Sequence, residues 1–402
     1  LKGHITELDG FRGIAILIVM IFHFTDVRFM PITALDRAII SVCQSLWIGV
    51  DMFFVLSGFL ITGILLDSRG KPKSLRNFYV RRVLRIFPLY YLLVILCLVV
   101  LPMFPHPKAQ NFGRIAGYEP LYWLFMSNIS VALSGEWRHA ALDITWSLAI
   151  EEQFYIIWPF IVLFSPIVWI KRVCYVLIPG AFVIRALMLA AGVDYDAVYV
   201  LAPTRMDPLL IGAFLALWLR EDPTRIVRHN SKAILTFLLS ATAAAVFLAS
   251  KTWSREPRLV TYFFGLSFIG VAFGATLLVI LGLHPDGIVR RILRWKALLT
   301  LGTLSYCIYL CHVPVRGIIR DVFIKLPGQD IFAVPVFMGS QMPVLIVFGL
   351  ASGIVSVGIA WVSWHSFEKQ FIKLKRFFPS GSATHVAESN ARPQHDQAKG
   401  NA

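Results

Sequence analysis

The sequence contains few charged residues. Asp, Glu, Lys and Arg make up 15% of its 402 residues, whereas they are about 25% of a typical soluble domain. Hydrophobic residues reach 57%, and the mean hydropathy is +0.70. This composition excludes a soluble globular protein. It predicts an all-α, polytopic integral membrane protein, because several apolar runs approach the ~20 residues that a helix needs to cross a bilayer.

Signatures of several other protein classes are absent from the sequence. The five cysteines form no CxxC pair, so neither a disulfide framework nor a zinc site of that kind is expected. No cluster of His, Cys, Asp and Glu has the spacing of metal ligands, and we predict no metal cofactor. No internal repeat supports an inverted-repeat transporter. The net charge of +15 does not indicate nucleic-acid binding, because basic loops orient membrane proteins.

Apolar runs predict ten membrane spans. They lie at about 11–29, 47–66, 84–104, 143–165, 173–193, 200–219, 233–250, 259–283, 297–319 and 342–364. The stretch 119–133 is shorter and ends in polar residues, so it is either an eleventh span or a segment in the membrane interface. Loop charge favours ten spans, because this topology places 23 Lys and Arg residues on one side and 11 on the other.

The same charge bias predicts that the N- and C-termini are both cytoplasmic. We expect residues 1–376 to form one transmembrane domain. Residues 377–402 are rich in polar side chains, which predicts a disordered cytoplasmic tail. The first span is not interpreted as a cleaved signal, because Glu7 and Asp9 precede it and no cleavage site follows it.

Two polar residues stand in the first predicted span. Arg12 and His23 are 11 residues apart, so they share one helix face and lie about 16 Å apart along its axis. Arg12 is either an anchor that reaches the membrane surface or a binding residue. His23 is either a hydrogen-bonded packing residue or a group that takes part in chemistry, since ionisable residues inside membrane spans are usually functional.

Further polar residues accompany the next two spans. Asp51 stands at the start of the second span, and Ser57 follows it among glycines that suit close helix packing. Arg81, Arg82 and Arg85 stand at the start of the third span. A basic cluster at that place suits either phosphate binding or anchoring at the membrane surface.

Carboxylates and a polar stripe mark two later spans. Glu151 and Glu152 are adjacent in an apolar helix and point about 100° apart, so at most one faces a given site. Ser305, Tyr309 and His312 fall on one face at i, i+4 and i+7. His312 has either a structural or a chemical role. Aromatic residues interpreted as candidates for the membrane-interface belt are Trp146, Tyr155 and Trp158.

Together these stretches resemble the membrane-bound acyltransferase family 3. It includes bacterial O-acetyltransferases of surface polysaccharides, nodulation-factor acetylases and macrolide acyltransferases. The resemblance runs from ELDGFRG at 7–13 to SFE at 366–368, with the Arg-x10-His pair, GVDMFFVLSGFLI, FYVRRVLRIFP, WSLAIEEQFY and SYCIYLCH between them. The chain departs from the family pattern at FEKQF, where a Pro would follow soon after FE. That departure puts a role of Glu368 in doubt.

The resemblance implies an O-acyltransferase in the cell (inner or plasma) membrane. Acyl-CoA, most often acetyl-CoA, would be the cytoplasmic donor, and a hydroxyl of a glycan or another carbohydrate-containing acceptor would receive the acyl group. The acceptor could be lipid-linked, and macrolide-modifying relatives take theirs from the cytoplasm. Arg82 and Arg85, with Arg81 in reserve, would bind donor phosphates. Arg12 would bind a phosphate or the pantetheine arm.

In this interpretation His23 is the general base. Glu151, or Glu152 if the helix is rotated, would orient the imidazole. A covalent acyl-histidine intermediate is an open alternative. Weaker candidates for contact with the substrate or the oxyanion are Asp51, Ser57, Tyr309 and His312.

Two other functions remain as alternatives. Polar residues inside a membrane serve transport equally well, so the chain could be a transporter or flippase of a lipid-linked sugar or small molecule. Release of free coenzyme A thiol would distinguish an enzyme from a transporter. A sensor or assembly partner without catalytic activity is the third hypothesis, and the retained Arg12–His23 spacing argues against it. The sequence indicates neither the acceptor nor the oligomeric state.

Overall fold

The computed structural model describes residues 4–25, 32–104, 117–137, 139, 141–249, 261–284, 286–323 and 336–379. Within these ranges the regular structure is helical, and no β-strand forms. The predicted all-α class is therefore confirmed. The predicted disordered tail falls outside the described residues from position 380 onward.

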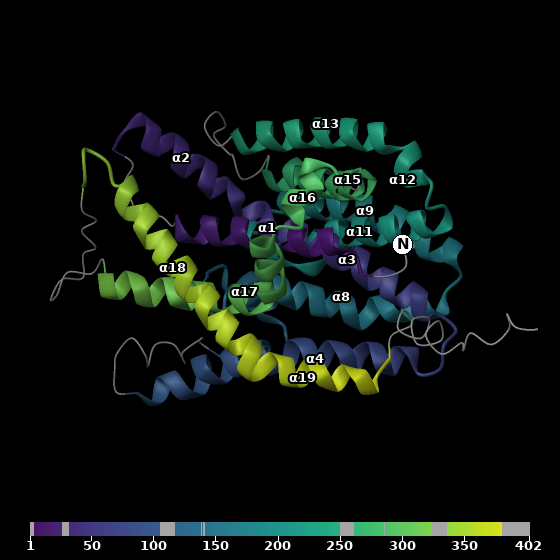
Figure 1. Cartoon of the computed structure of the whole chain (residues 1–402), viewed down its shortest axis with the longest axis horizontal. Helices are drawn as coiled ribbons and strands as arrows, with labels where there is room; N and C mark the ends of the chain where they lie inside the picture. Colours follow the sequence, from purple (N-terminus) through teal and green to yellow (C-terminus); the bar gives the residue numbers. More distant parts are fainter. Residues whose placement is uncertain are drawn as a thin grey trace, which may run out of the picture.

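The long helices agree with most of the predicted membrane spans (Figure 1). Among the described residues, eight helical segments are long and apolar enough to cross a membrane, and the chain is a multi-pass membrane protein. The helices in these segments are α2 (Ala34–Gln44), α3 (Gly49–Ser68), α4 (Ser74–Ile95), α8 (Thr145–Phe164), α9 (Ile167–Ala190), α10 (Tyr195–Val200), α11 (Ala202–Glu221), α15 (Leu266–Gly282), α17 (Lys296–Phe323), α18 (Met342–Ser363) and α19 (Lys369–Lys373).

The two other predicted spans are also helices. They are α1 (Thr6–Phe24) and α13 (Asn230–Ala249). Helix α1 carries three charged residues in its first turns, Glu7, Asp9 and Arg12. Such a helix is less apolar than a lipid-facing span, and α1 is instead surrounded by other helices: it packs against α3, α17 and α18. The first span therefore lies inside the bundle.

The uncertain stretch 119–133 does not form a spanning helix. It contains the short helices α6 (Glu119–Trp123) and α7 (Ser127–Ser134). The chain between them takes a positive φ of 55° at Phe125. A bilayer crossing needs about 20 helical residues, so these two helices are too short. The structure favours the ten-span topology over the eleven-span one.

Ion pairs join loops that the ten-span topology places on one side of the membrane. The pairs are Glu7 with Arg294, Asp67 with Arg220, and Lys171 with Glu221. The N–O distance is 2.6 Å in the first and 3.1 Å in the second. The loops they connect therefore lie at one end of the bundle, where the N-terminus also lies (Figure 1). Which compartment this end faces stays a prediction.

Glycines bring some helices into backbone contact. A methyl group on Gly302 of α17 would lie 2.0 Å from the carbonyl oxygen of Asp9 in α1. One on Gly58 of α3 would lie 1.8 Å from the carbonyl oxygen of Leu209 in α11. No larger side chain fits such distances, so these glycines serve close packing. Helices α1 and α17 are held together in this way, and both carry residues of the candidate site.

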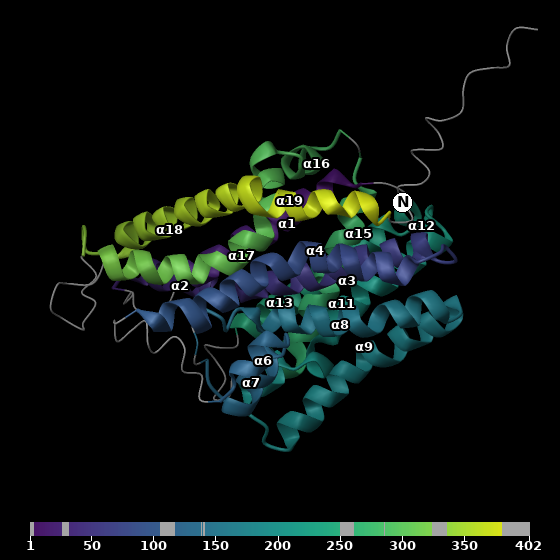
Figure 2. The same ribbon diagram turned by 90° about the horizontal axis from the view of Figure 1, so that it is seen from below.

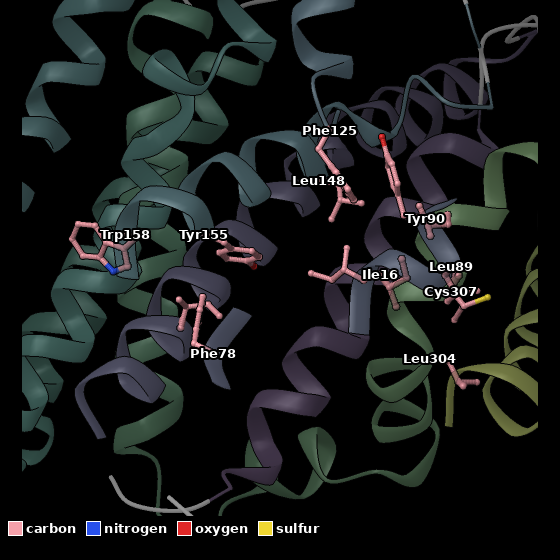
Figure 3. Close-up of a cluster of buried hydrophobic side chains, with 14 of the residues drawn as sticks. Ile16, Phe78, Leu89, Tyr90, Phe125, Leu148, Tyr155, Trp158, Leu304 and Cys307 are labelled. Atoms are coloured by element: carbon pink, nitrogen blue, oxygen red, sulfur yellow. The ribbon is translucent and has the colours of Figure 1, made fainter. Parts of the chain in front are cut away.

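The largest buried cluster lies where α1, α4, α8 and α17 meet (Figure 3). Tyr155 and Trp158 of α8 are only 3% and 2% exposed. The indole of Trp158 donates to the Thr62 hydroxyl at 2.8 Å. Trp146 is also buried. The interpretation of these aromatic residues as an interface belt is therefore wrong, because they fill the core.

Candidate active site

A cavity of about 120 Å³ lies among α1, α3, α4, α8 and α17. Its polar lining residues are Arg12, Ser57, Arg82, Arg85, Ser147, Glu151, Tyr155, Ser305, Tyr306 and Tyr309. Apolar residues, mostly of α3, complete the wall. Six sequence-predicted candidates from five separate segments line this cavity, although they are far apart along the chain: Arg12, Ser57, Arg82, Arg85, Glu151 and Tyr309. The other predicted candidates, His23, Asp51, Arg81, Glu152 and His312, do not line it.

Three guanidinium groups give part of this cavity a surplus of positive charge. Arg12, Arg82 and Arg85 lie within electrostatic reach of one another. Asp9 is 3.4 Å from Arg12 and forms its ion pair. The guanidinium carbon of Arg82 lies 5.2 Å from the centre of the Tyr155 ring. Arginine side chains arranged in this way are suited to binding phosphate groups.

The sequence pattern placed the arginines of α4 at the start of a helix, but in the structure they lie inside it. Helix α4 begins at Ser74, so Arg82 and Arg85 lie two to three turns inside it. A helix dipole acts mainly within the first turn, so these side chains offer their own charge alone. Arg81 points elsewhere: it donates to the carbonyl oxygen of Lys375 at 3.1 Å. The structure does not bring Arg81 to the cavity.

One wall of the cavity is a chain of hydrogen-bonded side chains. The Tyr155 hydroxyl donates to Glu151 Oε2 at 3.1 Å, and the same hydroxyl contacts the Ser57 hydroxyl. When Glu151 is ionised, the Tyr155 hydroxyl donates its one hydrogen bond to the carboxylate. The Ser57 hydroxyl must then be the donor in its contact with Tyr155. Ser57 is thereby engaged by the protein. Its predicted role as an oxyanion donor stays a prediction.

The two adjacent glutamates face different surroundings, as their helical spacing requires. Glu151 lines the cavity. Glu152 does not, and its side chain is buried with Oε1 lacking a hydrogen-bond partner among the described residues. Glu151 is therefore the carboxylate of the candidate site. The structure does not place either glutamate in contact with His23, so it does not support the predicted orienting role.

His23 has another histidine as its partner. His23 Nδ1 lies 3.2 Å from His312 Nε2, with the rings edge to face and their centres 4.8 Å apart. His312 is fully buried, whereas His23 is half-buried. The pair joins α1 to α17 about 15 Å along the helix axis from the backbone contact at Gly302. Arg316 donates to the carbonyl oxygen of His23 at 2.8 Å.

The hydrogen bonds fix the tautomers of this histidine pair. His312 Nδ1 lies 3.0 Å from the Ile308 carbonyl and 2.7 Å from the Tyr309 carbonyl, so it carries the proton and Nε2 is an acceptor. His23 Nδ1 must then donate to His312 Nε2, and it shares that proton with the Val19 carbonyl at 2.9 Å. The lone pair of neutral His23 is left on Nε2. Among the residues that the structure describes, that nitrogen has no hydrogen-bond partner, so it is available as a base.

This assignment changes the expected role of His312. An imidazole nitrogen that accepts a hydrogen bond cannot donate one to an oxyanion. In the neutral pair, His312 Nε2 therefore accepts the hydrogen bond from His23 Nδ1 and is in a position to orient that ring. It takes the place that the sequence reasoning had given to a carboxylate. The signal for this role was the position of His312 on the polar face of α17, but its partner could not be inferred.

Tyr309 stands between the cavity and the histidine pair. Its ring lines the cavity, and the ring centre lies 5.8 Å from that of His312. The Tyr309 hydroxyl donates to the Ile144 carbonyl at 2.8 Å and lies 2.5 Å from the Ser147 hydroxyl. Because its proton is engaged there, an oxyanion would have to compete for it. The oxyanion role of Tyr309 also stays a prediction.

Asp51 does not line the cavity, and its predicted contact with substrate is not supported. Arg205 Nη2 donates to Asp51 Oδ2 at 3.0 Å, and both side chains are fully buried. Nearby, Arg185 and Asp207 form a second buried pair with an N–O distance of 2.9 Å. Removing one partner of such a pair typically costs about 3–5 kcal/mol. Loss of the Asp51 carboxylate alone would therefore leave Arg205 buried without its ion-pair partner.

The sequence reasoning missed three polar residues of the cavity. They are Tyr155, Ser147 and Tyr306. Tyr155 follows Glu151 by four residues on α8, and that spacing could have indicated their hydrogen bond. Tyr306 donates to the Ile86 carbonyl of α4 at 2.8 Å, a contact that no local pattern predicts. The residues that the structure describes contain no group of three or more His, Cys, Asp and Glu arranged to hold a metal ion.

The chain is similar to curated bacterial O-acetyltransferases. The chain is 31% identical over 380 residues to the putative peptidoglycan O-acetyltransferase YrhL of Bacillus subtilis, an alignment that covers 91% of this chain and 54% of that protein. It is 31% identical over 329 residues to the peptidoglycan O-acetyltransferase OatA of Listeria monocytogenes, which covers 78% of this chain and 50% of that protein. The chain spans about half the length of the curated relatives it matches.

A more distant relative is the O-acetyltransferase OatA of Staphylococcus aureus, 26% identical over 350 residues that cover 83% of this chain and 53% of that protein. No solved structure matches the chain. The family model described as an acyltransferase domain matches residues 5–365. The match includes every segment that lines the cavity and both histidines of the pair. This chain therefore belongs to acyltransferase family 3.

Proposed function

We propose that the chain transfers an acyl group, most often acetyl, from acyl-CoA to a hydroxyl group of a glycan. The observation that carries this proposal is a cavity with three guanidinium groups in its wall, whose lining residue Tyr309 adjoins a histidine pair in which His23 Nε2 has no hydrogen-bond partner among the described residues. The guanidinium groups suit a donor with several phosphates and a long thioester arm. The His23 Nε2 atom suits an acceptor hydroxyl that must lose a proton. The comparisons support an O-acyltransferase in a membrane.

The donor would bind with its phosphates at Arg82 and Arg85. Arg12 would contact a phosphate or the upper part of the pantetheine arm. Because Arg12 and His23 lie about 16 Å apart along α1, the arm can extend through the cavity toward Tyr309. The thioester would then lie near the histidine pair. Its phosphates would stay at the end of the bundle that we predict to be cytoplasmic.

His23 would act as the general base. Its Nε2 takes the proton of the acceptor hydroxyl while the hydroxyl oxygen bonds to the thioester carbonyl carbon. The carbon–sulfur bond then breaks, and the leaving thiolate takes the proton from His23 to give free coenzyme A. During the charged stage, His312 Nε2 accepts a hydrogen bond from His23 Nδ1. Direct attack by His23 Nε2 on the thioester, which gives an acyl-histidine, uses the same geometry.

The acceptor that we propose is a hydroxyl of the cell-wall glycan, in the plasma membrane's immediate surroundings. This part of the proposal rests on the relatives, two of which are named as peptidoglycan O-acetyltransferases. Acetyl is the acyl group in all three relatives' names. A glycan hydroxyl is a weak nucleophile at neutral pH, so it needs the base that His23 would supply.

Two substitutions test the proposed roles. His23→Ala should lower the rate of coenzyme A release from acetyl-CoA and peptidoglycan fragments by about 10²–10⁴-fold, because general-base catalysis contributes that much. Arg82→Ala should raise the KM for acetyl-CoA by about tenfold or more, because it removes a charge-assisted hydrogen bond. Arg37→Ala is the control, since Arg37 is an exposed residue of α2. All variants are first checked for membrane insertion.

Three results would contradict the proposed roles. Full activity of the His23 variant would exclude this residue as the base. An unchanged KM for acetyl-CoA in the Arg82 variant would exclude its phosphate role. If the unsubstituted protein consumed no acetyl-CoA but moved a lipid-linked sugar across the membrane, the transporter alternative would replace the proposal.

A further inference from the structure

The segment that follows α18 returns along the outside of α4. It consists of a π-helical turn (Trp364–Glu368), α19 (Lys369–Lys373) and a 3₁₀ turn (Leu374–Phe377). Figures 1 and 2 both show α19 beside α4, and the two helices are in contact. The first turns of α4 and the end of this segment lie at the same end of the bundle as the N-terminus. Arg82 and Arg85 lie two to three turns further along α4, where they line the cavity.

The segment is attached to α4 through its backbone. Arg81 Nη1 donates to the carbonyl oxygens of Lys375 and Phe378, at 3.1 and 3.0 Å. Asn77 Nδ2 donates to the carbonyl oxygen of Pro379 at 3.1 Å. All three bonds are made to backbone carbonyl oxygens. The attachment of the segment to α4 through these bonds therefore does not require the Lys375 side chain.

The Lys375 ammonium group is placed among other cations. Arg81 donates to the Lys375 backbone at 3.1 Å, and the turn Leu374–Phe377 packs on α4, which carries all three arginines. The ammonium group therefore lies within electrostatic reach of Arg81, Arg82 and Arg85. In the part of the chain that the structure describes, none of Arg82, Arg85 and Lys375 forms an ion pair with a carboxylate at contact distance, although Glu151 lies within electrostatic reach of Arg82 and Glu368 within reach of Arg85. Like charges gathered on a partly buried surface repel one another, and a bound anion would offset that repulsion. Two of these cations line the cavity.

We propose that Lys375 is a phosphate-binding residue, and that the segment 364–379 supplies it to the guanidinium end of the cavity. The ligand is the phosphate-bearing nucleotide end of the acyl donor, so the inference rests on the proposed function. Arg81, which does not reach the cavity, takes part indirectly: it is a positioning residue that fixes the backbone at Lys375 and Phe378. A lipid headgroup offers the same phosphate chemistry, and the test separates the two sources.

The test measures the Kd of coenzyme A by calorimetry on the intact protein in nanodiscs. Lys375→Gln should raise the Kd by about tenfold, the effect of losing one charged contact of ~1.4 kcal/mol. Lys375→Arg should restore binding to within about threefold of the unsubstituted protein, because it keeps the charge. Lys373→Gln is the matched control: Lys373 is exposed, and its ammonium group contacts Gln370 Oε1 at 3.3 Å. The series is run in neutral lipid and in lipid containing phosphatidylglycerol.

The Kd increase should appear in both lipids and only in the Lys375→Gln protein. A Kd within twofold of the unsubstituted value would overturn the proposal. So would a change confined to discs with anionic lipid, which would assign Lys375 to a headgroup. Failure of the proposed function is distinguishable, because coenzyme A binding is measured without turnover: binding without acyl transfer would reject the function, whereas transfer with an unaffected Kd would reject only the role of Lys375.

Discussion

His23 can act as a base only through Nε2, because the hydrogen bonds of its other nitrogen are already made. Nδ1 donates to His312 and to the Val19 carbonyl. The orientation of His23 is therefore set by a neutral imidazole. A neutral acceptor avoids placing a carboxylate in a desolvated site, where an unpaired charge is expensive. Glu151 instead belongs to the hydrogen-bonded wall with Tyr155 and Ser57.

Substitutions of His312 test whether it positions His23. His312→Leu removes the acceptor, so kcat should fall by about 10–100-fold while the KM for acetyl-CoA stays within about twofold. His312→Gln offers a carbonyl oxygen to His23 Nδ1 and should recover a large part of kcat. A purely structural role would instead lower the amount of folded protein in both variants. Equal kcat values for the two variants would contradict the positioning role.

Close helix packing connects the two halves of the histidine pair. Helix α1 carries His23, α17 carries His312, and the helices are in backbone contact at Gly302. The positions of these helices in the chain follow from the sequence pattern, because apolar runs predict spans and small residues predict close contacts. The sequence pattern does not predict which helices pack against each other. The start of α4 was also misplaced, because the charged residues in its first turns resemble a loop.

Gly302→Ala should force α1 and α17 apart. The added methyl group would meet the carbonyl oxygen of Asp9 at 2.0 Å, and overpacking of this kind costs about 1–3 kcal/mol. We expect a lower Tm in a thermal unfolding scan and a lower acyl-transfer rate. Gly317→Ala is the control on the same helix, because no atom lies within 4 Å of a methyl group there; alanine favours a helix by about 1 kcal/mol over glycine, so its Tm should not fall.

If Gly302→Ala left both the Tm and the rate unchanged, the backbone contact would not position the site. A fall of equal size in the Gly317 variant would show that any alanine in α17 disturbs the protein, and would remove the link to packing.

One end of the helix bundle is rich in basic residues. The candidate site extends along the bundle axis, because Arg12 and His23 lie about 16 Å apart along α1. The loops at that end are joined by ion pairs such as Asp67–Arg220. Loop charge predicted which loops share a side, because positive residues near span ends are kept on the cytoplasmic face. Pairs such as Asp51–Arg205 were not predictable. Their partners are 154 positions apart, and only the packing of α3 on α11 brings them together.

Some site residues could be predicted from the sequence and others could not. Arg12, Arg82 and Glu151 stand out because a charge in an apolar run requires a reason. Tyr155 and Lys375 do not stand out: a tyrosine is ordinary in a membrane helix, and a lysine after the last span is an expected anchor. Their roles depend on neighbours from other helices, so they become visible only in three dimensions.

Cysteine labelling tests the orientation of the bundle. In a Cys43→Ser background, Arg228→Cys places a thiol at the basic end and Arg37→Cys places one on α2; both positions are exposed. With cytoplasmic termini, a membrane-impermeant maleimide should label the Cys at position 37 in intact spheroplasts and the one at 228 only after permeabilisation. The reverse pattern would place the guanidinium end outside the cell, where acyl-CoA is not available.

We propose that His23 drives transfer of an acyl group from coenzyme A to a glycan hydroxyl. The most direct test of this proposal is mass spectrometry of peptidoglycan fragments incubated with [¹³C]acetyl-CoA and the purified protein in nanodiscs. We expect ester-linked ¹³C-acetyl groups on the fragments with the unsubstituted protein and with Arg37→Ala, and at least about 100-fold less with His23→Ala. Equal labelling by the His23→Ala protein would contradict it.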